Sequence, residues 1–188
     1  DLMQRAGHYP PPPGVSDILG LEVSGTVVEA GPGVDSLRPG ERVCALLAGG
    51  GYAEEVVVDA RQVLPLPQGF GLRDAAALPE VFATAWLNLF MEGQLAAGER
   101  VLLHAGASGV GTAAIQLCRA FGHPCFVTAG SDDKLVACRE LGADGVFNRH
   151  QGSFVTAVKQ WGGADVILDP VGAAYNADNQ QVLNAERR

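Results

Sequence analysis

A glycine-rich turn between two apolar segments is the feature that most constrains how this chain folds. The apolar run at residues 101–104 predicts a buried strand, and the turn GASGVG follows at residues 106–111. Apolar residues then recur at the spacing of one helix face, at Val110, Ala113, Ala114, Leu117, Cys118 and Phe121. A second strand, predicted at Cys125–Ala129, completes a βαβ unit of about 30 residues, which favours a parallel α/β domain.

Such a unit commonly opens a dinucleotide-binding domain. Gly106 allows a tight turn, Gly111 allows the helix to pack closely on the strand, and the helix N-terminus offers free N–H groups to a pyrophosphate. We expect Ser108, Gly109 and Val110 to face the pyrophosphate of a nicotinamide cofactor. Ser108 stands where the motif often has a glycine, so a turn without a ligand is the alternative. The strand, helix and second strand around it favour the cofactor.

Composition narrows the class of partner. The chain has 188 residues, of which 47% are hydrophobic and 18% charged, as in globular proteins. Its net charge of −8 disfavours nucleic acid and anionic membranes. No apolar run reaches the ~18 residues of a membrane-spanning helix. The four cysteines form no CxxC pair, so we expect them to be reduced core residues of a cytoplasmic protein. With nucleic acid and membranes disfavoured, we expect a small-molecule substrate.

Residues 1–79 carry the pattern of a β-rich domain. Four prolines that begin at Pro10 exclude a helix or a central strand there, because proline fixes φ and lacks a backbone donor. Short apolar runs between turn signals predict strands at residues 22–29, 42–47 and 52–58. We expect these short strands to form a barrel-like arrangement.

Residues 80–188 instead alternate between helical and strand patterns. Helices are predicted at residues 81–90, 132–141 and 153–161, and further strands at 146–147 and 164–168. This alternation implies a Rossmann-type parallel sheet with right-handed crossovers. Ligands of such sheets bind at the carboxyl ends of the strands, which fall here at Ala105, Ala129 and Asp169.

Ordered segments along nearly the whole chain resemble the zinc-independent medium-chain dehydrogenase/reductases, in their quinone oxidoreductase branch. The segments are DLMQR at 1–5, Tyr9 with its proline run, ILGLEVSG at 18–25, HAGASGVGTAAIQL at 104–117 and VTAGSDDKL at 127–135. The resemblance implies a GroES-like substrate domain beside the Rossmann domain. It also implies that both domains are incomplete, so we expect an inactive internal fragment of a homodimer or homotetramer.

The resemblance also bears on metal. Zinc-dependent relatives place a ligand histidine in a GHE motif, and this chain has Gly20, Leu21 and Glu22 at the corresponding positions. Leucine cannot ligate zinc, which takes cysteine, histidine and carboxylate ligands. The cysteine-rich lobe that holds a structural zinc is absent as well. We therefore expect no metal site.

The end of the second strand bears on the choice between NADPH and NADH. Gly130 and Ser131 are small and neutral, which leaves room for a 2′-phosphate where an NAD enzyme has a carboxylate. Lys134 matches a phosphate-binding lysine of the family, and Arg149 adds a second cation. These residues favour NADPH as the cofactor. The two aspartates directly after Ser131 keep NADH open, because a carboxylate turned inward would repel the phosphate.

Two further residues are candidates through the resemblance. Thr84 matches a threonine that lies beside the nicotinamide, although a helical threonine commonly bonds only its own backbone. Tyr9 matches a tyrosine of the substrate cleft that would act on a quinone by stacking or hydrogen bonding. The alternative for Tyr9 is packing on the proline run.

Together these features predict an NADPH-dependent oxidoreductase that transfers a hydride to a quinone. Two alternatives stay open: an enone or alkenal reductase of the same family, and a cofactor-binding protein with a structural, crystallin-like role.

Overall fold

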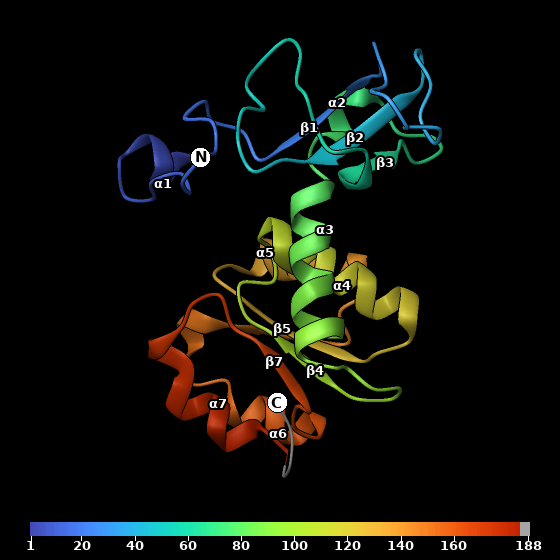
Figure 1. Ribbon diagram of the computed structural model, residues 1–188. Coiled ribbons are helices and arrows are strands. Elements are labelled where there is room, and N and C mark those ends of the chain that lie inside the picture. Colours follow the sequence, from blue (N-terminus) through green and yellow to red (C-terminus); the bar gives the residue numbers. More distant parts are fainter. Residues whose placement is uncertain (185–188) are drawn as a thin grey trace. The chain divides into compact units, whose positions relative to one another are not determined.

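The computed structural model describes residues 1–184, which fold as two compact units that meet in sequence between Glu80 and Val81 (Figure 1). Each unit has its own sheet. The four cysteines are all buried and free, and burial raises the pKa of the Cys44 and Cys138 thiols. No helix within these residues is long and apolar enough to cross a bilayer.

The first unit contains a three-stranded antiparallel sheet in the order β1-β2-β3. Its elements are α1 (Leu2–Arg5), β1 (Glu22–Thr26), β2 (Arg42–Leu46), η1 (Ala60–Gln62), β3 (Val63–Pro65) and α2 (Leu72–Ala75). Its buried hydrophobic side chains are few and mostly small: Cys44, Ala45, Leu47 and Ala75. The Ser24 hydroxyl in β1 donates a hydrogen bond to the Leu72 carbonyl, which ties α2 to the sheet.

The prediction of a strand at residues 52–58 is wrong. Within residues 1–184 no strand pairs with this segment, and the Val57 side chain is fully exposed. The chain instead turns against an earlier loop, where the Tyr52 N–H donates to the Leu19 carbonyl at 2.8 Å. The three consecutive valines at residues 56–58 favour a strand, but such a segment forms one only where a neighbouring strand satisfies its backbone groups.

The second unit contains a four-stranded parallel sheet in the order β6-β5-β4-β7. Its strands are β4 (Val101–Leu103), β5 (Cys125–Ala129), β6 (Gly145–Asn148) and β7 (Val166–Leu168). Its helices are α3 (Pro79–Trp86), the π-helix η2 (Leu87–Glu92), α4 (Gly109–Phe121), α5 (Asp132–Leu141), η3 (Arg149–Gln151), α6 (Val155–Trp161), η4 (Ala173–Tyr175) and α7 (Asn176–Val182). From β4 the chain adds β5 and β6 on one side of the sheet and then β7 on the other, so the topological switch point lies between β4 and β7. Ligands of such sheets bind at that point, at the carboxyl ends of the strands.

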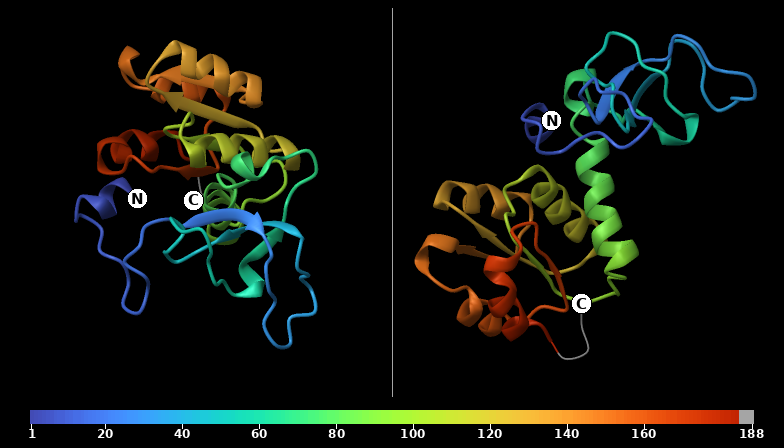
Figure 2. Two further views of the ribbon diagram at one scale, coloured as in Figure 1. Left: turned by 90° about the horizontal axis from the view of Figure 1, so that it is seen from above. Right: turned by 60° about the vertical axis from the view of Figure 1, so that its left-hand side comes forward.

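Both faces of this sheet are covered, as Figures 1 and 2 show: α4 and α5 lie on one face, and α6 and α7 on the other. Alternate residues of each strand enter two separate cores. In β4, Val101 and Leu103 pack in the core with α4, whereas Leu102 packs with Phe154 and Val158 on the opposite face. Sheets buried on both faces have nearly continuous apolar strands, which explains the short apolar runs in the sequence.

Most predicted elements of this unit are confirmed, with β5 and the helix at Asp132–Leu141 found at their predicted bounds. The helix predicted at residues 81–90 begins at Pro79 and continues as the π-helix to Glu92. Helix α7 was not predicted, because its sequence NADNQQV lacks an apolar period and Val182 is its one buried residue.

Candidate functional site

The turn after β4 is shaped by its contact with β5. The Gly106 N–H donates to the Thr128 carbonyl at 3.0 Å. A Cβ added to Gly106 would lie 1.9 Å from Cγ1 of Val127. The left-handed conformation in the turn belongs to Ala105, whose φ is +52°. The tight turn was expected at Gly106. Gly106 is needed for close packing on β5, and Ala105 adopts the conformation that a glycine usually takes.

Helix α4 begins directly at this turn. The Ser108 hydroxyl caps the helix by accepting a hydrogen bond from the Gly111 N–H at 3.1 Å. A Cβ on Gly111 would lie 2.6 Å from the Gly106 backbone, so the helix packs against the turn as predicted. Gly109 and Val110 form the first turn of the helix, where N–H groups have no carbonyl acceptor within the helix. These N–H groups are available to an anion.

Gly109 is a glycine for a reason that the sequence did not indicate. A Cβ added there would lie 2.9 Å from Cγ1 of Val81, at the start of α3. Val81 has a branched side chain with few rotamers, so it cannot move away easily. The close approach of α3 therefore requires a small residue at position 109 whether or not a ligand binds.

A pocket of about 220 Å³ opens at the carboxyl ends of β4 and β5. It is lined by Ala105, Ala107, Ser108, Thr128, Ala129, Gly130, Lys134, Arg149, Val171 and Tyr175. These residues come from the turn, the end of β5, α5, η3 and the segment after β7. Most of the lining residues are small, and two of them, Lys134 and Arg149, are cations.

The two cations of the pocket, Lys134 and Arg149, are exposed and have no carboxylate partner among residues 1–184. The ion pair found within those residues joins Arg61 to Asp59 instead, and it lowers the pKa of Asp59 to about 2. Gly130 lets the arginine lie close to the end of β5, because a Cβ there would be 3.2 Å from the Arg149 Nε. The positive charge of these two side chains is therefore free to bind an anion.

Asp132 and Asp133, the two aspartates that left NADH as a possible cofactor, do not line the pocket. The Asp132 carboxylate accepts a hydrogen bond from the Asn148 side-chain amide at 2.7 Å. The Asn148 side-chain oxygen in turn accepts from the His150 N–H at 3.1 Å. The bond between Asn148 and His150 spans Arg149. The bond between Asn148 and Asp132 holds the Asp132 carboxylate against Asn148.

A buried polar network adjoins the pocket. His104 follows β4 directly and is 1% exposed. Its Nδ1 lies 2.8 Å from the Thr128 hydroxyl, and its Nε2 lies 2.8 Å from the Asn179 side-chain oxygen. Burial lowers the pKa of His104, against the opposing effects of the hydrogen bond to Asn179 and the charge of Asp169. His104 is thus a buried histidine with both ring nitrogens satisfied.

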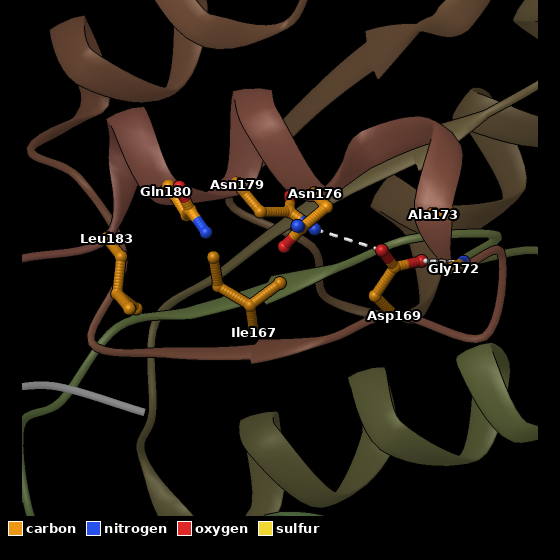
Figure 3. A pocket seen from close by; sticks show the side chains of 8 residues that line it. All are labelled: Ile167, Asp169, Gly172, Ala173, Asn176, Asn179, Gln180 and Leu183. Atoms are coloured by element: carbon orange, nitrogen blue, oxygen red, sulfur yellow. Dashed lines mark hydrogen bonds between the residues drawn. The ribbon is translucent and has the colours of Figure 1, made fainter.

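A second pocket of about 430 Å³ lies beside β7 and α7 (Figure 3). Its lining residues are Ile167, Asp169, Gly172, Ala173, Asn176, Asn179, Gln180 and Leu183. Leu183 forms a parallel bridge with Ala164, so the chain passes along the edge of the sheet at the end of α7. None of the predicted cofactor residues lines this pocket.

The smaller pocket brings together four of the predicted cofactor residues: Ser108, Gly130, Lys134 and Arg149. Four others, at positions 106 and 109–111, form the turn and the start of α4 beside it. Ser131 is the N-cap of α5 and does not line the pocket.

Two predicted residues lie elsewhere. Thr84 is in the middle of α3, where its carbonyl accepts from the Asn88 side-chain amide at 2.8 Å. Tyr9 is in the first unit, beyond α1, with 63% of its surface exposed. Neither lines the pocket, and the roles assigned to them stay predictions.

Val171 and Tyr175 line the pocket from the segment after β7, and neither was predicted from the sequence. Their only signal is their position a few residues after Asp169, which was expected at the carboxyl end of a strand. Ala105 and Ala129 were expected at strand ends and do line the pocket.

The residues at the GHE position serve the fold. The Glu22 carboxylate accepts a hydrogen bond from the Glu80 N–H at 2.9 Å, near the start of α3. A carboxylate there is stabilised by the positive end of the helix dipole. In the part of the chain that the structure describes, no group of three or more histidine, cysteine, aspartate or glutamate side chains is placed to hold a metal ion.

Two family models match the chain, one for each unit. Residues 1–68 match the alcohol dehydrogenase GroES-like domain, and residues 109–186 match the zinc-binding dehydrogenase family. The first unit is thus a partial GroES-like domain and the second a partial Rossmann-like domain.

Curated proteins of two kinds are similar to the chain. Polyketide synthase GfsB from Streptomyces halstedii is 39% identical over 177 residues, which are 93% of this chain and 3% of that protein. The synaptic vesicle membrane protein VAT-1 homolog from Homo sapiens is 35% identical over 185 residues, which are 97% of this chain and 47% of that protein. The chain therefore spans less than half the length of these relatives.

Solved structures of three activities share the fold. The quinone oxidoreductase from Thermus thermophilus, also solved with NADPH, is 34% identical with a TM-score of 0.77 over 96% of this chain and 57% of its own. CurK enoyl reductase is 30% identical with a TM-score of 0.80 over 88% and 51%. An NAD-dependent alcohol dehydrogenase is 32% identical with a TM-score of 0.81 over 88% and 57%.

Proposed function

This chain belongs to the medium-chain dehydrogenase/reductase family, and we propose that it binds NADPH at the pocket beside the glycine turn. The observation that carries the proposal is the unpaired positive side of that pocket. Lys134 and Arg149 follow β5 and β6 in a sheet whose carboxyl ends form the ligand site of the fold. Two cations without carboxylate partners among the described residues suit the 2′-phosphate that distinguishes NADPH from NADH.

The other walls fit the rest of a dinucleotide. The N–H groups of Gly109 and Val110 suit the pyrophosphate, and the small residues at the end of β5 leave room for a ribose. Asp132, which would disfavour a phosphate if it faced the pocket, is bound to Asn148. The NADPH complex of the Thermus quinone oxidoreductase also supports this cofactor, whereas the NAD-dependent alcohol dehydrogenase shows that the fold accepts NAD.

We propose reduction of quinones as the reaction. Bound NADPH would supply a hydride, and a proton from solvent would complete the two-electron reduction to the hydroquinone. The chain would supply position, because the turn and α4 would hold the cofactor. A quinone needs no metal to polarise it, because it is already electron-poor, and this agrees with Leu21 at the position of the zinc ligand.

Reduction of an enone or enoyl group is the second candidate. It is favoured by the similarity to CurK enoyl reductase and to polyketide synthase GfsB. The chemistry is close, since a hydride is added to an electron-poor carbon conjugated to a carbonyl. The acceptor alone distinguishes the two reactions.

The test is NADPH consumption by the whole protein, followed by absorbance, with a panel of quinones and a matched panel of enones and enoyl thioesters. Faster turnover of quinones supports the first proposal, and faster turnover of enoyl substrates supports the second. Tight NADPH binding without consumption by either panel would instead indicate a structural role. A variant with Lys134 replaced should raise KM for NADPH with every acceptor, because the cation serves the cofactor.

A further inference from the structure

Given the NADPH pocket of the proposed function, we propose that Asp169, Asn179 and His104 are positioning residues that hold one wall of that pocket. The wall is the segment at residues 171–175, which contributes Val171 and Tyr175 to the lining. None of the three positioning residues belongs to the set of cations and turn residues that would contact the cofactor. They act through the segment they hold.

The Asp169 carboxylate accepts three hydrogen bonds, two from the backbone of the wall segment and one from helix α7. Its Oδ1 accepts from the Val171 N–H at 2.8 Å and from the Gly172 N–H at 3.0 Å. Its Oδ2 accepts from the Asn179 side-chain amide at 2.9 Å (Figure 3). Hydrogen bonds to an ionised acceptor are among the strong ones. One carboxylate therefore fastens the pocket segment to helix α7.

The charge of Asp169 sets the direction of every bond in the network. An ionised carboxylate only accepts, so the Asn179 amide nitrogen donates to it and the Asn179 oxygen faces His104. His104 Nε2 must then carry a proton, which it donates to that oxygen. In the neutral ring Nδ1 is an acceptor, so the Thr128 hydroxyl donates to it. Each group has one role, and the ring cannot flip without losing both bonds.

His104 supports the wall by a second route. Its ring packs against both Phe154 and Tyr175, with ring centroids 4.8 Å and 4.6 Å away. Tyr175 also meets Phe154 at 5.5 Å, edge to face. Because Tyr175 lines the pocket, the orientation of the histidine ring fixes the position of a pocket side chain. The hydrogen bonds of His104 hold the ring in that orientation.

The alternative is a histidine that only fills space in the core. The two roles make opposite predictions for two substitutions. His104→Phe keeps a flat ring against Phe154 and Tyr175 but loses both hydrogen bonds. His104→Gln loses the ring but keeps a donor for Asn179. Positioning through the network predicts that His104→Phe weakens NADPH binding more than His104→Gln does, and simple packing predicts the reverse order.

The main experiment compares Asn179→Leu with Gln180→Leu in the whole protein. Both replace an amide on α7, but Gln180 has no bond to the network. Two quantities are measured: the NADPH Kd, and the hydrogen exchange of the Val171 and Gly172 amides without cofactor. We expect Asn179→Leu to raise the Kd by about tenfold and to speed exchange at both amides, because it removes one charge-assisted bond. Gln180→Leu should change neither.

The outcomes separate this proposal from the proposed function. Unchanged exchange in Asn179→Leu, or equal effects of the two leucine variants, would overturn the network. If the unaltered protein binds no NADPH, the proposed function fails, and faster amide exchange in Asn179→Leu alone would still establish the positioning role. If Asn179→Leu does not fold, the order of His104→Phe and His104→Gln decides the question.

Discussion

Gly106 packs directly on Val127, and a Cβ on the glycine would lie 1.9 Å from Cγ1 of the valine. The turn that opens α4 is thereby built on the neighbouring strand β5. Gly111 packs on Gly106 from the other side, where a Cβ would be 2.6 Å from its backbone. Strand, turn and helix are one packed unit, so the position of the helix N-terminus depends on both glycines.

Replacing Gly106 with alanine should therefore destabilise the second unit by about 2 kcal/mol or more, because overpacking strains a dense interior. Val127→Ala removes the clashing Cγ1, so the double variant should lose less stability than the sum of the two single losses. Gly25→Ala is a control for added Cβ, since nothing lies within 4 Å of a Cβ there. Urea unfolding of these four variants and of the unaltered protein measures this, and strict additivity would contradict the packing.

Ser108 should contribute to stability through its cap of α4. Ser108→Ala removes the acceptor for the Gly111 N–H and should cost about 1 kcal/mol. Ser108→Gly is the matched comparison, because glycine is also accepted at N-caps and should cost only a few tenths of a kcal/mol. Thermal unfolding of the two variants checks the order. If glycine is as damaging as alanine, the hydroxyl bond contributes nothing.

The burial of His104 predicts a pH dependence of stability. Its pKa is lowered in the folded protein, so below about pH 6.5 the unfolded chain binds a proton that the folded chain does not. The stabilisation is complete above that pH and is lost as the pH falls through the lowered pKa. Unfolding free energy should decline on acidification, and His104→Gln should remove that part of the decline. An identical pH profile in the variant would show that His104 does not titrate as described.

The hydrophobic pattern of the sequence predicts the strands and helices of the parallel sheet, because each strand pairs with its neighbours in that sheet. Strand β5 and helix α5 have their predicted bounds, and Lys134 and Arg149 share a pocket because both follow strands of one parallel sheet. The carboxyl ends of such strands meet at one edge, so residues far apart in sequence can be placed together from the pattern alone.

Other parts depend on contacts that the sequence pattern does not carry. Residues 52–58 end in three β-branched valines that favour a strand, but the segment has no partner strand within the described residues. The left-handed turn conformation lies at Ala105, which no propensity would indicate. In the proposed network, the wall formed by Val171 and Tyr175 depends on the bond between Asp169, which follows β7, and Asn179, which lies on α7. Only their positions in space show that they act together.

The direct test of the central claim is the Kd for NADPH and for NADH, measured by titration of the whole protein and of Lys134→Ala. Lys159→Ala, on the exposed side of α6 and outside the pocket, is the matched control. We predict tighter binding of NADPH than of NADH. Lys134→Ala should weaken NADPH by roughly 10- to 100-fold with little effect on NADH, because a charge-assisted bond to phosphate is lost. Equal weakening of both cofactors, or no preference for NADPH in the unaltered protein, would contradict the assignment of this pocket.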